Sequence, residues 1–275
     1  MSLLPEQVDL ATAVSAHVSD GDCVYLGNFG SQLFAVGHEL IRQNRQGLHI
    51  VMGSAGLLLD QLIGAGVVAE ATFAHCWNPI GPAPTWNFRR MAESGSSDVK
   101  LHEVTFAMLN GALQAGAWGV PFMPVVMAPG TGYVTDDWSK GGMANASSPF
   151  GDCNVMRALV PDVAFVHADW VDQLGNAVIE GPVGESVVAA QSARTSVIIA
   201  EALGTVQEIR NLNPSLPGLY VSAIAVVKGS ARPDGTLHGY PRDVGQYEEY
   251  TRVTASEDGF AQWLTQLRST QDMTT

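Results

Sequence analysis

Short apolar runs rich in β-branched residues alternate with longer segments of helical period along most of this chain. The run CVYLGNF predicts a strand, and QLFAVGHELIRQN after it predicts a helix with Leu33, Val36, Gly37, Leu40 and Ile41 on one face. Strands without polar residues, such as SVIIA, are typical of a sheet whose two faces are both covered by crossover helices. The alternation therefore predicts an α/β fold, with a mostly parallel open sheet and helices on both faces.

The same alternation predicts most of the remaining elements. Strands are expected at LHIVMGS, VVAEATFAH, VKLHEV and PDVAFVHADWV, the last followed by a turn and a hairpin. Helices are expected at the N-terminus, GLLLDQLIGAG, PTWNFRRMAESG, TFAMLNGALQAGAWG, GESVVAAQS and GFAQWLTQLRS. The rhythm breaks between Gly130 and Asp152, where we expect a long functional loop or a small excursion from the sheet. With no repeat, linker or low-complexity tract, residues 1–275 are predicted to form a single domain.

The composition limits the partners and the location of the protein. Its 275 residues are 46% hydrophobic and 15% charged, which is enough apolar material for a sizeable core. The formal net charge of -13 disfavours nonspecific binding to nucleic acid, which requires clustered Lys and Arg. Glu6 and Asp9 interrupt the apolar residues of the N-terminal segment, which is therefore not a signal peptide, and no apolar run is long enough to span a membrane. We expect a cytoplasmic protein that does not contact a membrane.

The cysteines and histidines do not predict a metal site. Cys23, Cys76 and Cys153 lie far apart and form no C-x-x-C pair, so neither a disulfide framework nor a zinc site is indicated. The histidines include no H-x-x-x-H pair. The segment WNPIGPAPTW, which contains Trp77 and Trp86, is expected to line a pocket or a partner surface, or else to be a covered core position.

Glycine-bearing turns follow several of the predicted strands. In an open parallel sheet, ligands bind at the carboxyl ends of the strands, where glycines let the main chain approach a carbonyl or a phosphate. GNFGS is such a turn, and Ser31 is expected to cap the next helix, although the spacing is not that of a dinucleotide-binding fingerprint. A shared ligand cleft and ordinary tight loops both remain open. The residues expected to bind the ligand are Gly27, Asn28, Phe29, Gly30, Ser31, Ser54, Gly130 and Thr131.

Two glutamates are weak candidates for a nucleophile. Glu201 is expected just after the strand TSVIIA, at the mouth of a cleft, where nearby donors can stabilise developing negative charge. It is explained equally well by an ion pair with Arg194 or Arg210. Glu103 is expected to begin a helix, as is Glu185, and the helix dipole alone accounts for an acidic residue there.

Four stretches, SDGDCVYLGNFGSQLFAVGHELIRQ, EVTFAMLNGALQAGAWGVPFMPV, PDVAFVHADWVDQLGNAV and SVIIAEAL, follow one another in a recognisable order. The chain resembles the A (alpha) subunit of the family I coenzyme A transferases, near the glutaconate CoA-transferase branch. The resemblance spans most of the chain and implies the CoA-transferase (NagB/RpiA-like) fold. It also implies an enzyme that moves CoA between an acyl-CoA and a carboxylic acid, through an acyl anhydride and a glutamyl-CoA thioester.

In that family the reacting glutamate usually belongs to the B subunit, in a sequence of the type S-E-N-G, which this chain lacks. The resemblance therefore implies a chain without a catalytic residue of its own, which works with a beta subunit. Coenzyme A would be a substrate, and no cofactor is expected. The glycine turns would offer N–H donors to the acyl oxygen. The chain departs from the family at Asn28, which replaces the second glycine of the usual GGFG and is expected to narrow the acyl pocket.

Two alternatives remain open at this level. A related branch cleaves a ring hydrolytically in steroid breakdown with a glutamate of its alpha chain, which would align at or near Phe106, three residues from Glu103. The chain would then be a subunit of a CoA-thioester hydrolase or ring-cleaving enzyme of steroid or aromatic catabolism. The other alternative is a noncatalytic ligand-binding or sugar-phosphate-sensing protein on a similar α/β scaffold.

Overall fold

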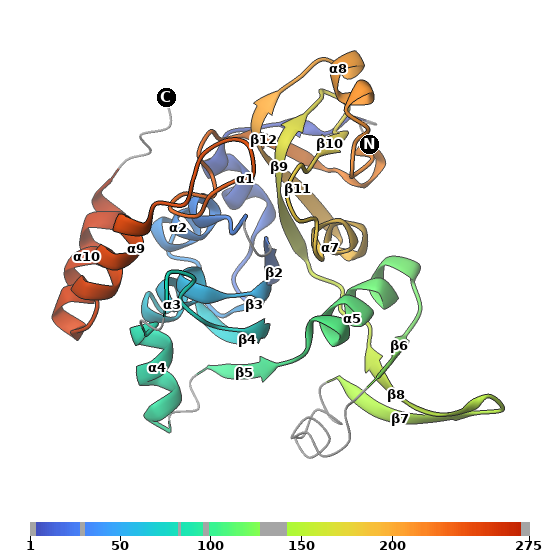
Figure 1. Cartoon of the computed structure of the whole chain (residues 1–275), viewed down its shortest axis with the longest axis horizontal. Helices are drawn as coiled ribbons and strands as arrows, with labels where there is room; N and C mark the ends of the chain where they lie inside the picture. The colour runs from blue at the N-terminus through green and yellow to red at the C-terminus, as the bar shows by residue number, and fades with distance from the viewer. Residues whose placement is uncertain (1–3, 28–30, 82–83, 96–98, 127–141, 271–275) are drawn as a thin grey trace.

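The computed structural model describes residues 4–27, 31–81, 84–95, 99–126 and 142–270. Within these residues the main sheet has nine strands, in the order β1-β12-β11-β9-β2-β3-β4-β5, with β10 paired to β9 (Figure 1). All pairs in this sheet are parallel except β10 with β9. The predicted α/β fold with a mostly parallel sheet is confirmed.

The bounds of the elements follow the sequence pattern closely in the first half of the chain. The strands of the main sheet are β1 (Glu6–Gln7), β2 (Cys23–Leu26), β3 (Leu48–Ser54), β4 (Val68–His75), β5 (Lys100–Glu103), β9 (Val163–Val171), β10 (Ala177–Val178), β11 (Thr195–Leu203) and β12 (Ala223–Val226). The helices are α1 (Leu10–His17), α2 (Phe34–Arg42), α3 (Gly56–Gly64), α4 (Trp86–Glu93), α5 (Phe106–Trp118), α7 (Ser186–Ser192), α8 (Val206–Asn211), α9 (Val244–Val253) and α10 (Glu257–Ser269), with a short 3-10 helix, η2 (Gly218–Tyr220).

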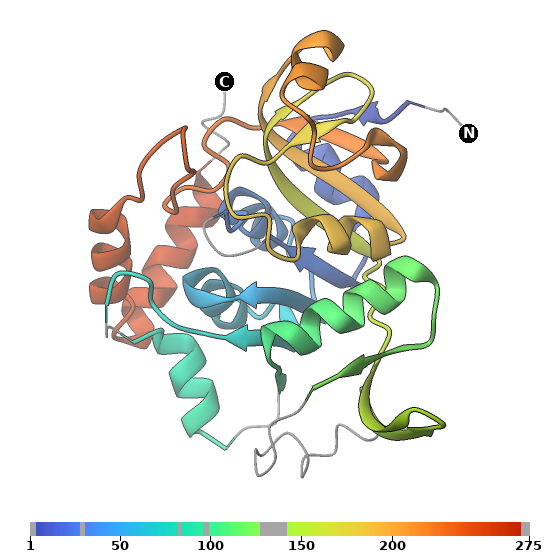
Figure 2. The ribbon, with the colours of Figure 1, turned by 45° about the vertical axis from the view of Figure 1, so that its right-hand side comes forward.

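Helices cover both faces of the main sheet, as the apolar strands predicted. On one face, α1, α2 and α3 pack against the sheet with α9 and α10 outside them, and Leu58 of α3 belongs to the apolar core on this side. On the other face, α5 and α7 lie side by side (Figure 2), and Leu113 of α5 belongs to the second core. Alternate residues of one strand serve the two cores, since Ile50 and Met52 of β3 face the first and Val51 faces the second.

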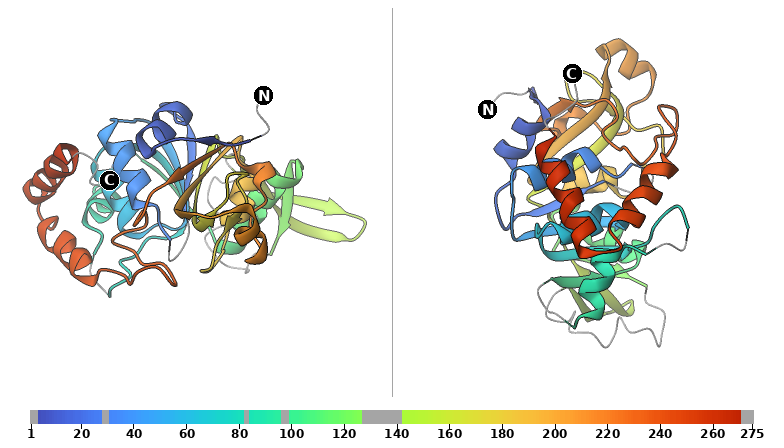
Figure 3. Two further views of the ribbon diagram at one scale, coloured as in Figure 1. Left: turned by 90° about the horizontal axis from the view of Figure 1, so that it is seen from above. Right: turned by 90° about the vertical axis from the view of Figure 1, so that its left-hand side faces the viewer.

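A second, antiparallel sheet extends from the α5 side of the molecule. It consists of β6 (Phe122–Val125), β7 (Met143–Ser148) and β8 (Gly151–Arg157), in the order β6-β8-β7. The hairpin of β7 and β8 projects away from the body in the left view of Figure 3. The break in the sequence rhythm is therefore, in its described part, a small excursion from the main sheet. Gly130 and Thr131 lie outside the described residues.

Two expected positions are wrong. Glu103 ends β5 and does not begin a helix, because α5 begins only after its N-cap Thr105, whose hydroxyl accepts the N–H of Met108 at 3.1 Å. Glu201 lies inside β11 and not after it, because pairing with β9 continues as far as Leu203. In the described part of the chain, no helix is long and apolar enough to cross a membrane.

Candidate functional site

The carboxyl ends of four neighbouring parallel strands form one edge of the sheet. Gly27 follows β2, Ser54 ends β3, His75 ends β4 and Glu103 ends β5. We call these strand ends and the residues directly after them the carboxyl edge. Open parallel sheets bind their ligands at such an edge, because the chains diverge there and helix N-termini point toward it. The ligand site that the glycine turns predicted is therefore expected at this edge.

The turn after β2 is tight and requires glycine. Gly27 has a φ of 80°, in the left-handed region that other residues rarely adopt. A Cβ at this position would lie 2.6 Å from the backbone oxygen of Ser31, so a larger residue would open the turn. Ser31 is not the cap of α2, because the N-cap residue is Leu33. The other expected members of this turn, Asn28, Phe29 and Gly30, lie outside the described residues.

Ser54 and His75 form a hydrogen-bonded pair across β3 and β4. The hydroxyl oxygen of Ser54 lies 2.9 Å from Nε2 of His75. Burial lowers the pKa of His75 below its ordinary value of 6.5, so the imidazole is neutral near pH 7. In the tautomer with the hydrogen on Nε2, the ring donates to Oγ of Ser54 and leaves the single hydroxyl hydrogen free for a ligand. A serine hydroxyl next to a neutral imidazole can orient toward a reacting carbonyl group. The sequence singled out Ser54, but nothing in it indicated that His75 would be its partner.

Gln32 places an unpaired acceptor beside this pair. Its Nε2 donates to the backbone oxygen of Ser54 at 2.6 Å, which fixes the orientation of the amide because only the NH2 group can donate. Its Oε1 is buried and has no hydrogen-bond partner in the described structure. An unpaired buried oxygen costs on the order of 1–3 kcal/mol, so a ligand that brings an N–H group to this point would recover that free energy. No local pattern in the sequence pointed to this residue.

Two exposed aromatic rings flank His75. Trp77 is 47% exposed and Phe106 is 39% exposed. Their ring centroids lie 5.9 and 5.4 Å from that of the imidazole, both in edge-on geometry. Of Trp77 and Trp86, for which the sequence left a pocket or partner surface and a covered position open, Trp77 is exposed. Trp86 is half-buried and its Nε1 donates to the backbone oxygen of Thr251 at 2.9 Å, which fixes it against α9.

Glu185 is buried next to Phe106. It is the N-cap residue of α7, and its Oε1 accepts the N–H of Gly53 at 3.0 Å. Burial raises the pKa of this carboxyl group above its ordinary value. A Cβ at Gly53 would overlap Oε1 of Glu185 and would lie 2.7 Å from Cε1 of Phe106, so glycine makes room for both groups. Sequence reasoning explained Glu185 by the helix dipole and missed its contact with the edge.

Glu201 is held by its neighbours in a way that suits a structural role. Its carboxylate accepts hydrogen bonds from the N–H of Gly229 at 2.6 Å, from the N–H and hydroxyl of Ser230 and from the hydroxyl of Tyr240 at 2.8 Å, and it lies 3.2 Å from Nε2 of His167. Burial raises its pKa, but the hydrogen bonds from His167, Gly229 and Tyr240 outweigh burial, and the pKa is lowered overall. The carboxylate anchors the loop that follows β12.

Glu103 is exposed at the end of β5. Residues two apart on a strand face the same side, and Leu101 packs against the core that contains α3. Glu103 therefore points toward that side of the sheet, which by the same rule is also the side of Ser54 and His75, two residues after Met52 and Phe73, whereas Gly53 and Glu185 meet on the other side. A catalytic role for Glu103 or Glu201 stays a prediction.

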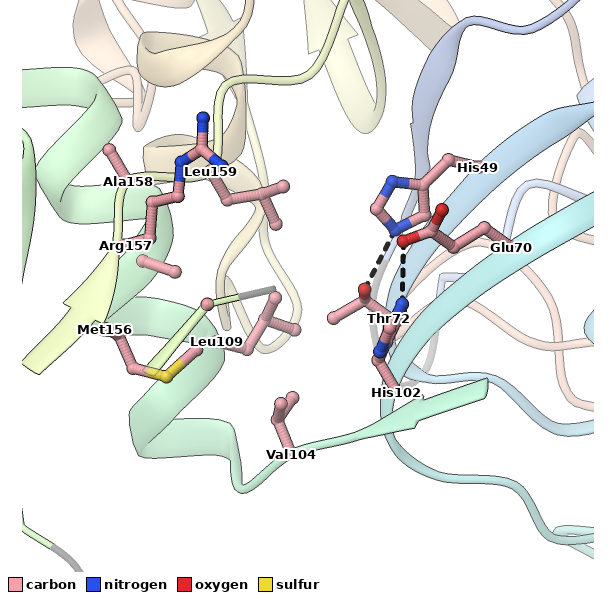
Figure 4. A pocket seen from close by; sticks show the side chains of 12 residues that line it. His49, Glu70, Thr72, His102, Val104, Leu109, Met156, Arg157, Ala158 and Leu159 are labelled. Atoms are coloured by element: carbon pink, nitrogen blue, oxygen red, sulfur yellow. Dashed lines mark hydrogen bonds and ion pairs between the residues drawn. The ribbon is translucent and has the colours of Figure 1, made fainter. Parts of the chain in front are cut away.

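A hollow of about 90 Å³ lies between α5, β8 and the main sheet (Figure 4). Its polar lining consists of His49, Glu70, Thr72 and His102 on the main sheet and Arg157 of β8 across from them. Nε2 of His49 lies 2.8 Å from Oγ1 of Thr72, and Nε2 of His102 lies 2.7 Å from Oε1 of Glu70. His49 lies five residues before Ser54 on β3, roughly 16 Å at ~3.3 Å per residue, whereas His102 and Val104 lie directly before and after Glu103, so the hollow extends to the carboxyl edge at the end of β5. Among the described residues, no cluster of three or more His, Cys, Asp or Glu is placed to hold a metal ion.

Comparison with known proteins identifies the family. The family model of coenzyme A transferase matches residues 8–227 of this chain. The chain belongs to the coenzyme A transferase family. The A subunit of the 3-oxoadipate CoA-transferase of Pseudomonas knackmussii is 30% identical to this transferase chain, over 98% of the chain and 96% of the relative. The A subunit of the glutaconate CoA-transferase of Acidaminococcus fermentans is 26% identical, over 91% and 84%.

Solved structures agree with this assignment. The crystal structure of the Acidaminococcus fermentans glutaconate coenzyme A-transferase matches with a TM-score of 0.90 at 23% identity, covering 97% of this chain and 90% of that chain. A variant of the decarboxylase AibA/AibB matches with a TM-score of 0.83 at 25% identity, covering 95% and 99%. The predicted resemblance to the alpha chains of CoA-transferases is confirmed. The ring-cleaving alternative has less support, because the cholesterol ring-cleaving hydrolase IpdA subunit of Mycobacterium tuberculosis is 25% identical over only 62% of this chain.

Proposed function

We propose that this chain is the alpha subunit of a heteromeric CoA-transferase, and that the glutamate that reacts with the acyl-CoA is supplied by a beta subunit. The proposal is carried by the state of the glutamates around the described carboxyl edge. Glu185 is buried against Gly53 and Phe106, and Glu201 is bound by the loop after β12. Neither of these two carboxylates is free to attack a thioester at the edge, which leaves the exposed Glu103 as the glutamate of this chain whose adduct the test below must exclude.

The described groups suit the stabilisation of the acyl thioester. When a partner carboxylate attacks the acyl carbonyl carbon, the C–S bond breaks, CoA leaves as thiolate and an acyl anhydride remains. Thiolate attack on the glutamyl carbonyl then gives glutamyl-CoA and the free carboxylic acid. In both additions negative charge develops on a carbonyl oxygen, and a positioned donor lowers that barrier. The hydroxyl of Ser54, held by the neutral imidazole of His75, is such a donor at the strand ends.

The side chain of Gln32 can accept a hydrogen bond from the amide-bearing pantetheine arm of coenzyme A. The arm contains amide N–H groups, and Oε1 of Gln32 is a buried acceptor without a partner in the described residues. One such amide would satisfy the oxygen and position the thioester next to Ser54, whose backbone oxygen Gln32 already binds. Coenzyme A serves as a substrate in this scheme, and the chemistry requires neither a cofactor nor a metal.

The ring of Phe106 disfavours the hydrolytic alternative. The resemblance places the hydrolytic glutamate of the ring-cleaving branch at or near this residue, and a phenyl ring can neither deprotonate water nor act as a nucleophile. The carboxyl group of Glu185 is buried and accepts the N–H of Gly53, so it does not substitute for the lost one.

The test uses the chain by itself and together with a candidate beta subunit that contains an S-E-N-G sequence. We expect transfer of CoA to an added carboxylic acid only by the two chains together, and mass spectrometry of the complex after incubation with acyl-CoA should find the CoA adduct on the glutamate of the beta subunit. Turnover by the isolated chain, or an adduct on this chain, would contradict the proposal. Carboxylate formation without an acceptor acid would indicate hydrolysis, and CO2 release would indicate decarboxylation.

A further inference from the structure

We propose that the acyl group transferred at the carboxyl edge is apolar at the end far from the thioester, and that Trp77 and Phe106 select it. This inference rests on the proposed function and names its substrate class. It predicts alkyl or ring-bearing monocarboxylic acids, in contrast to the acids for which the two transferase relatives are named, 3-oxoadipate and glutaconate, which carry a second carboxylate.

An aromatic surface lies next to the reacting position. Trp77 and Phe106 come from different connections, after β4 and after β5, yet both rings contact the imidazole of His75. That imidazole is hydrogen-bonded to Ser54, the donor that we place at the acyl oxygen. An acyl chain whose carbonyl oxygen meets Ser54 therefore has two large apolar rings beside it. Burying apolar surface against such rings is favourable in proportion to the area removed from water.

The charge of the segments around these rings also favours an apolar acyl group. Residues 53–60, 75–81 and 103–110 follow or end β3, β4 and β5, and none of these described segments contains a Lys or Arg. The carboxyl groups in or next to them are those of Asp60, Glu103 at the end of β5 and Glu185 against Gly53. A second carboxylate on the substrate would lose its hydration here without gaining a cationic partner, and such transfers are costly.

Lys100 lies at the opposite end of β5 from Glu103, and on α4 Arg89 pairs with Glu93 and Arg90 donates to Asn87. Two further described cations lie past the end of another strand. Lys228 and Arg232 follow β12, which is separated from β4 by β11, β9, β2 and β3 in the order of the sheet. The guanidinium carbon of Arg232 lies 4.5 Å from the centroid of the Tyr240 ring, so this group is already engaged on that loop. A carboxylate held between Trp77 and Phe106 does not have these cations as its partners.

The position of the Phe106 ring is fixed by its neighbours. Its ring fills the space that the missing side chain of Gly53 leaves, next to the buried carboxyl group of Glu185. The hydroxyl of Thr105 caps the helix that Phe106 begins. A ring held from two sides loses little conformational freedom when a substrate binds, so it can discriminate between acyl groups.

The experiment uses the complex with the beta subunit, together with two thioesters of six carbons, hexanoyl-CoA and adipyl-CoA, which differ by a terminal carboxylate. We expect kcat/KM for hexanoyl-CoA to exceed that for adipyl-CoA at least about tenfold, in line with discrimination by apolar pockets. Trp77→Ala and Phe106→Ala should each lower kcat/KM for hexanoyl-CoA roughly tenfold and leave acetyl-CoA, which is too short to reach the rings, nearly unchanged. Trp118→Ala is the matched control, because Trp118 is 67% exposed at the far end of α5.

Each outcome is decisive. A preference for adipyl-CoA, or unchanged selectivity in both variants, would overturn the inference while leaving CoA transfer intact. Variants that no longer form the complex in size-exclusion chromatography would show that the rings contact the beta subunit instead, which also overturns it. If the complex transfers neither thioester, the proposed function fails, and calorimetric binding of the two thioesters still decides whether the edge prefers the apolar chain.

Discussion

The Oγ of Ser54 and Nε2 of His75 lie 2.9 Å apart because their strands pair in a parallel register that sets these two residues opposite each other. Both residues are the last of their strands, β3 and β4. The sheet itself thus brings a hydroxyl group and an imidazole together at the edge where the substrate is proposed to bind. The pair requires no loop to position it, which makes it a well-defined target for substitution.

Replacing Ser54 by alanine tests the proposed donor. We expect Ser54→Ala to lower kcat of the complex about 10- to 100-fold, since loss of one donor to a developing oxyanion has effects of this order or larger. Ser192→Ala is the control, because Ser192 is also buried but its hydroxyl donates to Ala189 within α7. Full activity of the Ser54 variant would exclude the hydroxyl as a donor to the acyl oxygen.

The pH profile tests the role of His75. Burial lowers the pKa of its imidazole below 6.5, so the ring remains neutral as the pH falls through that value and becomes charged only at lower pH. We expect kcat/KM to stay level from about pH 8 down to about pH 6.5 and to fall only at lower pH, once the protonated ring places a positive charge between the apolar rings of Trp77 and Phe106. His75→Gln should lose this acidic limb. An identical limb in the variant would assign the titration to another group.

Glu201 provides a test of stability. Its pKa in the folded chain lies below the ordinary value of 4.5, so its contribution to stability is fully present above that pH and is lost as the pH falls through the folded value. We expect Glu201→Gln to lower the free energy of unfolding by about 2–3 kcal/mol at pH 7, and the difference should shrink in acid. Urea unfolding at both pH values measures it.

The control for Glu201 is a surface glutamate that also has a hydrogen-bonded partner. Glu249 pairs with Arg252 at 2.6 Å on α9, with both side chains exposed. Exposed ion pairs contribute about 0–1 kcal/mol, so Glu249→Gln should change stability little at either pH. If the two variants behaved alike, the carboxylate of Glu201 would not be the anchor of the loop after β12.

The sequence predicted those helices and strands whose own residues show the full apolar pattern of a helix or a buried strand. LHIVMGS became β3 at Leu48–Ser54, residue for residue, because its apolar side chains fill both cores. The strand β7 was not predicted, since MANASS contains no β-branched apolar residue and is held mainly by pairing with β8. The elements β12 and α9 were missed as well. The four apolar residues of β12 lie among Pro, Gly and Ser, and the pattern of α9 is mostly polar.

The site was less predictable than the fold, because its contacts join distant residues. Glu185 and Gly53 are 132 residues apart in the sequence, and no local pattern predicts that the carboxyl group of Glu185 lies next to Gly53. Glu201 was expected after its strand because the apolar run ends at Ala200, whereas pairing with β9 extends the strand to Leu203. Ser54 could be named in advance because a strand end and a glycine turn are both visible locally.

Gly53→Ala tests whether the contact between Glu185 and Phe106 matters. The added methyl group would overlap Oε1 of Glu185 and lie 2.7 Å from Cε1 of Phe106, so one of the two must move. Overpacking of this kind costs about 1–3 kcal/mol, and we expect a lower midpoint of urea unfolding together with a loss of transfer. In the control Gly181→Ala, the nearest atom, Cβ of Leu237, is 4.0 Å away, and both quantities should be unchanged.

Thr72→Val tests whether the hollow of Figure 4 is structural. Valine keeps the shape of threonine but removes the hydroxyl that lies 2.8 Å from Nε2 of His49, which leaves a buried polar group without its partner. We expect a loss of about 1–3 kcal/mol in the free energy of unfolding and no change in kcat, because this hydroxyl is bonded to His49 and not to the pair of Ser54 and His75. Thr265→Val on the exposed face of α10 should be close to neutral, since its hydroxyl donates only to Ala261 in the same helix. A variant of Thr72 with normal stability and impaired transfer would place the hollow within the active site, which it would join at the end of β5, where Val104 lines the hollow one residue after Glu103.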